Sequence, residues 1–251
     1  MRYLLELSFD GSNYHGWQVQ PKSSSVQETI EKCISTILEK KINLVGAGRT
    51  DAGVHALYFC AHFDSPKKIT NKKDFIHKLN SFLPNDISVK NIIAVNENFH
   101  ARFDAISRTY IYKLNLVKNP FLVKNSYYLK NKNLSFSKMN LAALKLYNYK
   151  DFKCFSKSNS DVKTFNCEIT NLKWTKQTDY WIFEISANRF LRNMVRAIVG
   201  TLIEIGKKKY NINYLDDIIL SRDREKAGYS VPAHGLYLSN IIYPKNIFIN
   251  E

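Results

Sequence analysis

The stretch RYLLELSF, residues 2–9, places Tyr3, Leu5, Leu7 and Phe9 on one face of an extended chain. This period of two predicts a half-buried β-strand. The next signal is Ser25-Val26-Gln27-Glu28, which has the form of a helix capping box. Apolar residues then follow at helical spacing, at Val26, Ile30, Cys33, Ile34, Ile37 and Leu38. The chain therefore begins with a strand that leads into an amphipathic helix.

The same order of elements occurs twice along the chain. The first half continues with strands at 42–46 and 56–63, a helix at 73–83 stopped by Pro84, and a strand at 87–95. The second half has strands at 107–117, 166–175, 179–187 and 235–243, and helices at 137–149 and 190–205. Each half fits the ferredoxin-like βαββαβ pattern. We expect an α+β fold of two halves, 1–105 and 106–251, with a central cleft between them.

The composition indicates a globular protein with an anionic partner. The 251 residues are 45% hydrophobic and 13% aromatic, which is ample for a packed core. Lys and Arg number 37 against 22 Asp and Glu, a net charge of +15. Such an excess is typical of proteins that face nucleic acid or an anionic membrane surface, although a lysine-rich sequence bias also produces it.

Several function classes are disfavoured. The four cysteines are scattered without a CxxC pair, so a disulfide framework or a zinc site is not expected, and reduced thiols in the cytosol are. No apolar run approaches the roughly 18 residues of a membrane span. The start MRYLLELSFD carries Glu6 and Asp10 and does not resemble a signal peptide. The sequence predicts a cytoplasmic protein that holds no metal.

The segment GAGRTDAGVH, residues 46–55, is a candidate functional loop. Its glycine spacing approaches that of a Walker loop, but Val54 and His55 stand where Lys and Ser or Thr are required. A dinucleotide fingerprint is disfavoured because Asp51 occupies the third glycine position, where a carboxylate would repel a pyrophosphate. Asp51 is therefore the conspicuous group of this loop.

Asp51 can be interpreted in two ways. Flanking glycines let the backbone approach a substrate closely, and Arg49, two residues away, favours an ionised carboxylate suited to act as a nucleophile or base. The alternative is an aspartate that stabilises a turn or caps a helix. Three histidines, His55, His62 and His100, are candidate bases, although isolated histidines are more often structural.

Arginines and tyrosines in the second half suggest contacts with RNA. Arg189, Arg192 and Arg196 recur at i, i+3 and i+7, as a stripe beside the apolar surface of the predicted helix 190–205. This stripe is either a solvent-exposed face or a set of residues that bind phosphates. Other residues are also of the types that bind RNA: arginines contact its backbone and tyrosines stack on its bases. They are Arg102, Arg108, Tyr110 and Tyr112.

Seven stretches together resemble the TruA family of tRNA pseudouridine synthases. They are FDGSNYHGWQVQ (9–20), GAGRTDAGVHA (46–56), LNSFLPNDISV (79–89), FHARFDA (99–105), SRTYIY (107–112), NRFLRNMVRAIVGTL (188–202) and PAHGLYL (232–238). The resemblance implies a pseudouridine-synthase-type mixed or antiparallel sheet. It also implies isomerisation of uridine to pseudouridine at positions 38, 39 and 40 of the tRNA anticodon stem-loop, a homodimer, and no cofactor or metal.

The resemblance assigns roles to four residues. The essential aspartate of the family falls on Asp51, the base-contacting tyrosine on Tyr110, and the active-site arginine on Arg196. Arg49 resembles the residue that fills the base stack when the target nucleotide flips out. Attack on C1′ of the ribose, attack on C6 of the uracil, and assistance in proton removal remain open for Asp51.

The chain departs from the family pattern in two places. Leu57-Tyr58-Phe59 replaces the usual Gly-Gln-Val, and Leu146-Tyr147-Asn148-Tyr149 replaces a stretch that contains glycine. Both changes add bulk and aromatic rings to these segments. A rival hypothesis is a basic tRNA-binding or chaperone protein without turnover, but such a protein gains nothing from a carboxylate that faces phosphates.

Overall fold

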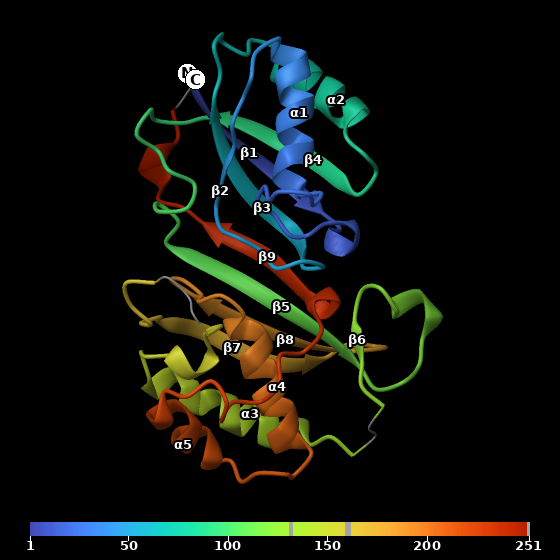
Figure 1. Ribbon diagram of the computed structural model, residues 1–251, viewed down its shortest axis with the longest axis vertical. Coiled ribbons are helices and arrows are strands. Elements are labelled where there is room, and N and C mark those ends of the chain that lie inside the picture. Colours follow the sequence, from blue (N-terminus) through green and yellow to red (C-terminus); the bar gives the residue numbers. More distant parts are fainter. Residues whose placement is uncertain (131–132, 159–161, 250–251) are drawn as a thin grey trace. The chain divides into compact units, whose positions relative to one another are not determined.

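The computed structural model describes residues 1–130, 133–158 and 162–249 (Figure 1). The chain forms two compact units, Met1–Ile106 with Leu238–Glu251, and Ser107–Tyr237. The sequence pattern groups residues 106–251 together, whereas the structure assigns the C-terminal segment to the first unit. Hydrogen bonds between residues far apart in the chain hold it there, such as those from Asn96 N–H to Ile247 O (3.1 Å) and from Ile106 N–H to Ile242 O (2.9 Å).

The first unit contains an antiparallel group of strands. β1 (Arg2–Phe9) pairs on one side with β3 (His55–Asp64) and on the other with β4 (Ile87–Ala94). The two-residue strand β2 (Val45–Gly46) also pairs with β3, and β9 (Leu236–Ile242) is the next neighbour of β3. The odd-numbered side chains of β1, Tyr3 to Phe9, are buried, as the sequence pattern predicts.

Two helices complete the first unit. α1 (Val26–Leu38) begins at Ser25, whose Oγ accepts the N–H of Glu28 at 3.3 Å, so the predicted N-cap is confirmed. The buried side of α1 consists of predicted apolar residues, Val26, Ile30, Ile34 and Leu38. α2 (Lys72–Phe82) ends just before Pro84, where the sequence predicts the stop.

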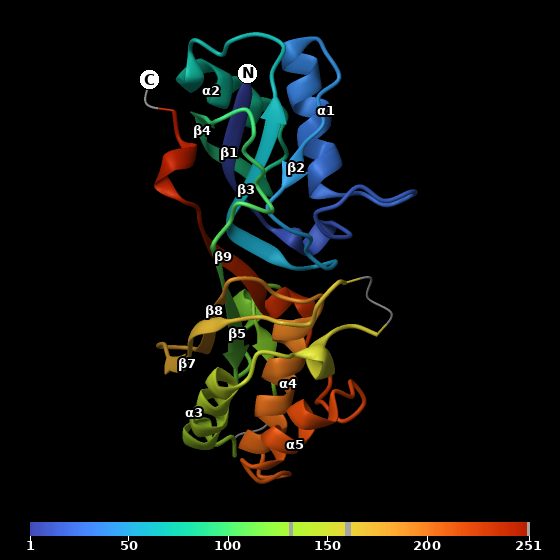
Figure 2. The ribbon, with the colours of Figure 1, turned by 90° about the vertical axis from the view of Figure 1, so that its left-hand side faces the viewer.

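The second unit pairs β5 (Ser107–Asn115) with β8 (Trp181–Ala187) and β8 with β7 (Ile169–Lys176), all antiparallel. The short strand β6 (Tyr127–Tyr128) runs parallel to β5. Figure 2 shows the three helices of this unit lying together: α3 (Phe136–Lys145), α4 (Met194–Gly206) and α5 (Tyr214–Ser221). Nearly every residue of α4 is buried, which makes it the central helix of this unit.

The chain follows the predicted strand-helix-strand-strand-helix-strand order twice, with β6 and α5 as additions. Short 3-10 helices lie at Gly11–Asn13, Pro120–Leu122, Leu146–Asn148, Lys153–Phe155, Ala233–Gly235 and Lys245–Ile247. The α+β fold class predicted from the sequence is therefore confirmed.

One helix prediction is wrong at its start. α4 begins at Met194 rather than at 190, because Asn193 has a left-handed backbone with φ of 68° that cannot continue a right-handed helix. Arg189 and Arg192 therefore precede the helix, and only Arg196 lies on it. The predicted arginine stripe along a single helix does not exist.

Candidate active site

The glycine-rich segment 46–56 connects β2 to β3 and carries Asp51 in a tight turn. The N–H of Val54 donates to the carbonyl oxygen of Asp51 at 3.2 Å, and Gly53 between them has φ of 76°, a value that favours glycine. Asp51 is half-buried, and Arg49 is exposed two residues before it. The loop therefore fixes the backbone of Asp51.

The segment 9–17 packs directly against this turn. The N–H of Gly53 donates to Tyr14 O at 3.2 Å, and the N–H of Trp17 donates to Thr50 Oγ1 at 3.0 Å. Gly16 has φ of +91°, and a Cβ atom there would lie 2.2 Å from Thr50 O. The two motifs that surround Asp51 thus touch backbone to backbone, and no residue larger than glycine fits at position 16 without rearrangement.

Three buried aromatic rings support the loop from behind. Trp17 and Phe59 stack with centroids 4.1 Å apart, and Phe9 meets Phe59 edge-on at 5.6 Å. Gly46 lies against the same cluster, because a Cβ on it would come within 2.4 Å of Trp17 Nε1. Phe59 belongs to the Leu57-Tyr58-Phe59 departure, so this part of the departure serves packing.

The remaining aromatic residues of the two departures are tied to neighbouring elements. The Tyr58 hydroxyl donates to Glu6 Oε1 at 2.6 Å. The Tyr147 hydroxyl accepts the N–H of Leu172 at 3.1 Å, and the Tyr149 hydroxyl donates to Asp216 at 2.9 Å. These contacts join β3 to β1 and the end of α3 to β7 and α5.

The three candidate histidines accept backbone N–H groups. Nδ1 of the buried His55 accepts the N–H of Gly11 at 3.1 Å and lies 3.0 Å from Asp10 Oδ1. Nδ1 of His100 accepts the N–H groups of Arg102 at 3.2 Å and Phe103 at 3.3 Å. In the same way, Nδ1 of His62 accepts the N–H of Ala101 at 3.1 Å. This geometry favours the structural interpretation over catalytic bases.

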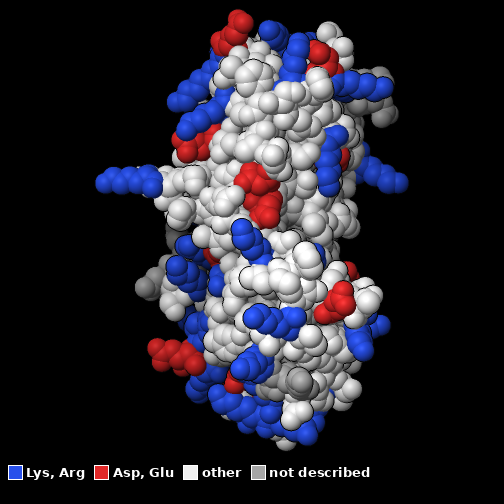
Figure 3. Space-filling model, turned by 90° about the vertical axis from the view of Figure 1, so that its right-hand side faces the viewer, with Lys and Arg blue, Asp and Glu red and all other residues white. Residues whose placement is uncertain are grey.

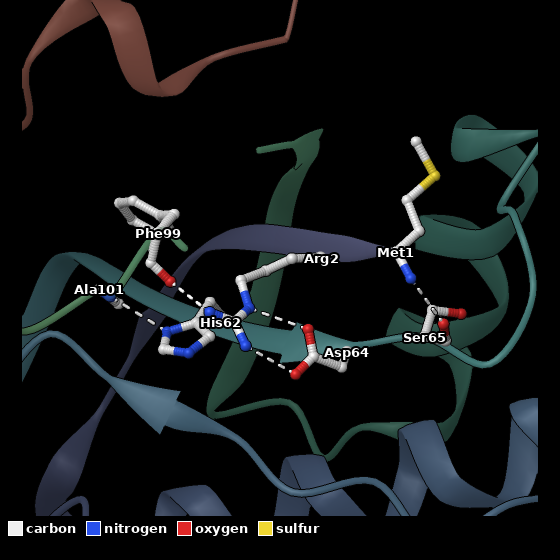
Figure 4. A network of polar contacts seen from close by, with 7 residues as sticks. All are labelled: Met1, Arg2, His62, Asp64, Ser65, Phe99 and Ala101. Carbon is white, nitrogen blue, oxygen red and sulfur yellow. Dashed lines mark hydrogen bonds and ion pairs between the residues drawn. The ribbon is translucent and has the colours of Figure 1, made fainter. Parts of the chain in front are cut away.

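Figure 4 shows His62 within a polar network of the first unit. Burial, together with the nearby Arg2 cation, lowers the pKa of His62 to about 4. Arg2 donates to both carboxylate oxygens of Asp64, at 2.9 and 2.8 Å, and to Phe99 O at 2.8 Å. The network anchors the start of the FHARFDA segment.

Tyr110 and Arg196 both belong to the second unit. Tyr110 is half-buried in β5 opposite Ile185 of β8, and its ring meets Phe190 edge-to-face, with centroids 5.1 Å apart at 87°. Arg196 is half-buried near the start of α4, where Nε donates to Val231 O at 2.7 Å and the N–H of Val231 donates back to Arg196 O at 3.3 Å. Each of the two side chains is therefore held by a specific neighbour.

The segment that anchors Arg196 lies close along α4. A Cβ on Gly200 would fall 1.8 Å from Tyr229 O, and the N–H of Gly228 donates to Thr201 Oγ1 at 2.8 Å. Neither Val231 nor Phe190 could be predicted as a site residue from the sequence. Phe190 lies in the NRFLRN stretch, where an aromatic between two arginines is the only local signal, and Val231 acts through its backbone.

The family profile described as tRNA pseudouridine synthase matches residues 7–104 and 142–244 of this chain. The chain belongs to the tRNA pseudouridine synthase family. The matched ranges contain Asp51 and Arg196, whereas Tyr110 lies between them.

Related proteins match this chain in sequence over almost its whole length. The chain is 48% identical over 248 residues to a protein from Bacteroides fragilis named tRNA pseudouridine synthase A, with 98% of both chains covered. It is 47% identical over 247 residues to a protein of that name from Parabacteroides distasonis (98% of both) and 48% identical over 254 residues to one from Porphyromonas gingivalis (99% of both). The predicted family is confirmed, and the synthase is an isomerase.

Two structural features are absent from residues 1–130, 133–158 and 162–249 of the synthase. No group of three or more His, Cys, Asp or Glu side chains in that part of the synthase could hold a metal ion. No helix in it is both long enough and apolar enough to cross a bilayer.

Gly16→Ala is expected to destabilise the synthase by about 2 to 4 kcal/mol, because alanine adds backbone strain and a clash with Thr50 O. Gly48→Ala is the matched control in the neighbouring loop, since no atom lies within 4 Å of the Cβ it would add. Urea unfolding of both variants measures the difference. Equal loss of stability in the two variants would contradict the proposed close approach.

Proposed function

We propose that this synthase isomerises uridine to pseudouridine in the tRNA anticodon stem-loop, at positions 38, 39 and 40, with Asp51 as its catalytic residue. The observation that carries the proposal is the construction of the Asp51 turn. Segments 9–17 and 46–56, each rich in glycine, fix this turn by direct backbone contacts on a buried aromatic cluster. Such preorganisation suits a side chain that must meet a substrate in one position.

The reaction moves the ribose from N1 to C5 of the uracil. The C1′–N1 bond breaks and a C1′–C5 bond forms, the hydrogen on C5 leaves as a proton, and N1 gains a proton, so no redox partner is required. The Asp51 carboxylate serves this rearrangement by attack on C1′ or on C6, or by assisting proton removal. Each route needs the carboxylate beside a nucleotide that has left the base stack.

The other site residues act on the flipped nucleotide. Tyr110 offers an aromatic face to the uracil, Arg196 holds a carboxylate or phosphate, and Arg49 occupies the space left in the stack. In this proposal the N-terminal part, residues 1–105, supplies the catalytic loop, and the part 106–251 supplies Tyr110 and Arg196. The enzyme works in the cytoplasm as a homodimer and without a cofactor.

Tyr110→Ala is expected to lower kcat about tenfold or more, in line with the 1–3 kcal/mol of a stacked base, while Kd for tRNA changes little. Arg196→Ala is expected to lower kcat by a similar factor, because it removes charge-assisted hydrogen bonds to the reacting group. Arg196→Lys keeps the charge but loses the Nε bond to Val231 O, so it is expected to behave like Arg196→Ala. Single-turnover kinetics on folded variants, checked by thermal melting, measure these effects. Full activity in Arg196→Lys would make Arg196 a simple phosphate contact.

The rival hypothesis, a basic tRNA-binding or chaperone protein without turnover, is tested by one assay. Release of tritium from [5-³H]uridine-labelled tRNA occurs in this isomerisation because C5 loses its hydrogen. The proposed function requires time-dependent release that depends on the protein. Tight tRNA binding without any release would favour the rival.

A further inference from the structure

The loop of residues 116–126, here called the Phe121 loop, exposes apolar side chains to solvent. It connects β5 to β6 and stands out from the second unit beside β6 in Figure 1. The side chain of Phe121 is 89% exposed, that of Val117 70% and that of Val123 60%. Exposed apolar residues this close together are typical of a binding surface.

Hydrogen bonds build the Phe121 loop into a defined shape. At its base, the buried Asn115 and Ser126 bond to each other at 2.8 Å, and Asn115 Nδ2 also donates to Val117 O at 2.8 Å. At its tip, the Asn119 side chain accepts the N–H of Phe121 at 3.0 Å and begins the 3-10 turn. The ring of Phe121 is therefore presented by a preorganised turn, which lowers the entropic cost of binding.

The charge of this region identifies the kind of partner. Lys118 and Lys124 flank Phe121, and the sequence from residue 105 to 150 contains nine Lys and Arg but no Asp or Glu. Residues 107–237 carry 23 Lys and Arg and 10 Asp and Glu, a net charge of +13 out of the total of +15. Figure 3 shows blue side chains gathered over the lower part of one face. A polyanion fits this surface.

We infer that the Phe121 loop is an RNA-binding element, in which Phe121 stacks on an unpaired base while Lys118 and Lys124 contact the adjoining phosphates. The combination of an exposed aromatic ring with flanking cations is the one that holds single-stranded nucleotides. The lack of Asp and Glu between residues 105 and 150 favours a polyanion over a second copy of the chain, and a contact between copies is an outcome of the test below.

The Phe121 loop adds a contact at a distance from Tyr110. Asn115, at its base, lies five residues beyond Tyr110 along β5, which corresponds to about 17 Å. A nucleotide bound by the loop is therefore not the target uridine. The inference rests on the proposed function only in taking tRNA as the substrate.

The test compares tRNA affinities of Phe121→Ala, Phe121→Leu and Phe121→Trp, measured by filter binding of an unmodified tRNA transcript at fixed salt. Phe121→Ala and Phe121→Leu are expected to weaken binding about tenfold, because one stacked base contributes 1–3 kcal/mol, while Phe121→Trp retains wild-type affinity. Phe82→Ala on α2 is the matched control, since Phe82 is exposed but lies in the first unit, which has little net charge. Its affinity should remain unchanged.

Two outcomes would overturn the inference. The first is wild-type affinity in Phe121→Ala, or in Phe121→Leu, which would exclude stacking. The second is an altered oligomeric state of Phe121→Ala in sedimentation equilibrium, which would make the loop a contact between copies of the chain. Binding is measured without turnover, so failure of wild-type protein to release tritium would refute the proposed function separately.

Discussion

Asp51→Asn is expected to abolish pseudouridine formation, with kcat reduced by at least about 10⁴-fold and Kd for tRNA changed less than threefold. The substitution removes the negative charge but keeps the size of the side chain. It also keeps the turn, because the hydrogen bond from Val54 N–H ends on the backbone carbonyl of residue 51. Tritium release under single-turnover conditions measures the chemistry, and filter binding measures the affinity.

Asp74→Asn provides the matched control for Asp51→Asn. Asp74 is an exposed carboxylate on α2 whose ion pair with Lys78 contributes little to stability. This variant should show wild-type turnover and wild-type affinity. Turnover of Asp51→Asn above the level without enzyme would refute Asp51 as the essential carboxylate, provided that its melting temperature matches that of the wild type.

The affinity for tRNA is expected to fall by about 10³-fold or more between 50 and 200 mM salt. This is the loss typical of six or more phosphate contacts, each of which adds about −0.7 to −0.9 to the slope of log K against log salt. Residues 107–237 hold a net charge of +13, whereas the remainder holds 14 Lys and Arg against 12 Asp and Glu. Most phosphate contacts should therefore involve the second unit.

Charge-removing variants test this distribution. Arg192→Gln, at an exposed position just before α4, should reduce the salt slope by about one contact. Lys73→Gln, at an exposed position on α2 in the first unit, should leave the slope unchanged. Two results would show that the positive charge of the second unit does not bind RNA. One is a tRNA affinity of the wild-type protein that does not change with salt, and the other is an equal effect of the two variants on the salt slope.

Elements with a local signal could be predicted from the sequence. β1 and α1 follow from residue spacing and from the Ser25 cap, and both form as expected. The start of α4 could not be predicted, because Phe190 and Leu191 continue the apolar spacing while Asn193 leaves the helical region of backbone space. The placement of residues 238–249 depends on hydrogen bonds across about 150 residues, such as that between Asn96 and Asn246, and no local pattern encodes them.

The candidate site also has features that the sequence indicates and features that only the structure shows. The glycines around Asp51 indicate a close backbone approach, but the sequence does not say which backbone approaches; the structure identifies Thr50 as the partner of Gly16. The hydrogen bond from Arg196 Nε to Val231 O could not be predicted either, because every residue carries a backbone carbonyl and the sequence does not show which one accepts. The roles of Asp51, Tyr110, Arg196 and Arg49 remain predictions.

The use of Nδ1 of His62 as a hydrogen-bond acceptor has a consequence for the pH dependence of stability. An imidazole that accepts through Nδ1 carries its hydrogen on Nε2, so the His62 ring is held in its neutral form. For His62 the folded-state pKa of about 4 lies below the ordinary 6.5. Its contribution to stability is therefore complete above pH 6.5 and is lost as the pH falls toward 4. Acid therefore weakens the attachment of the FHARFDA segment, because protonation of Nδ1 removes the lone pair that accepts the N–H of Ala101.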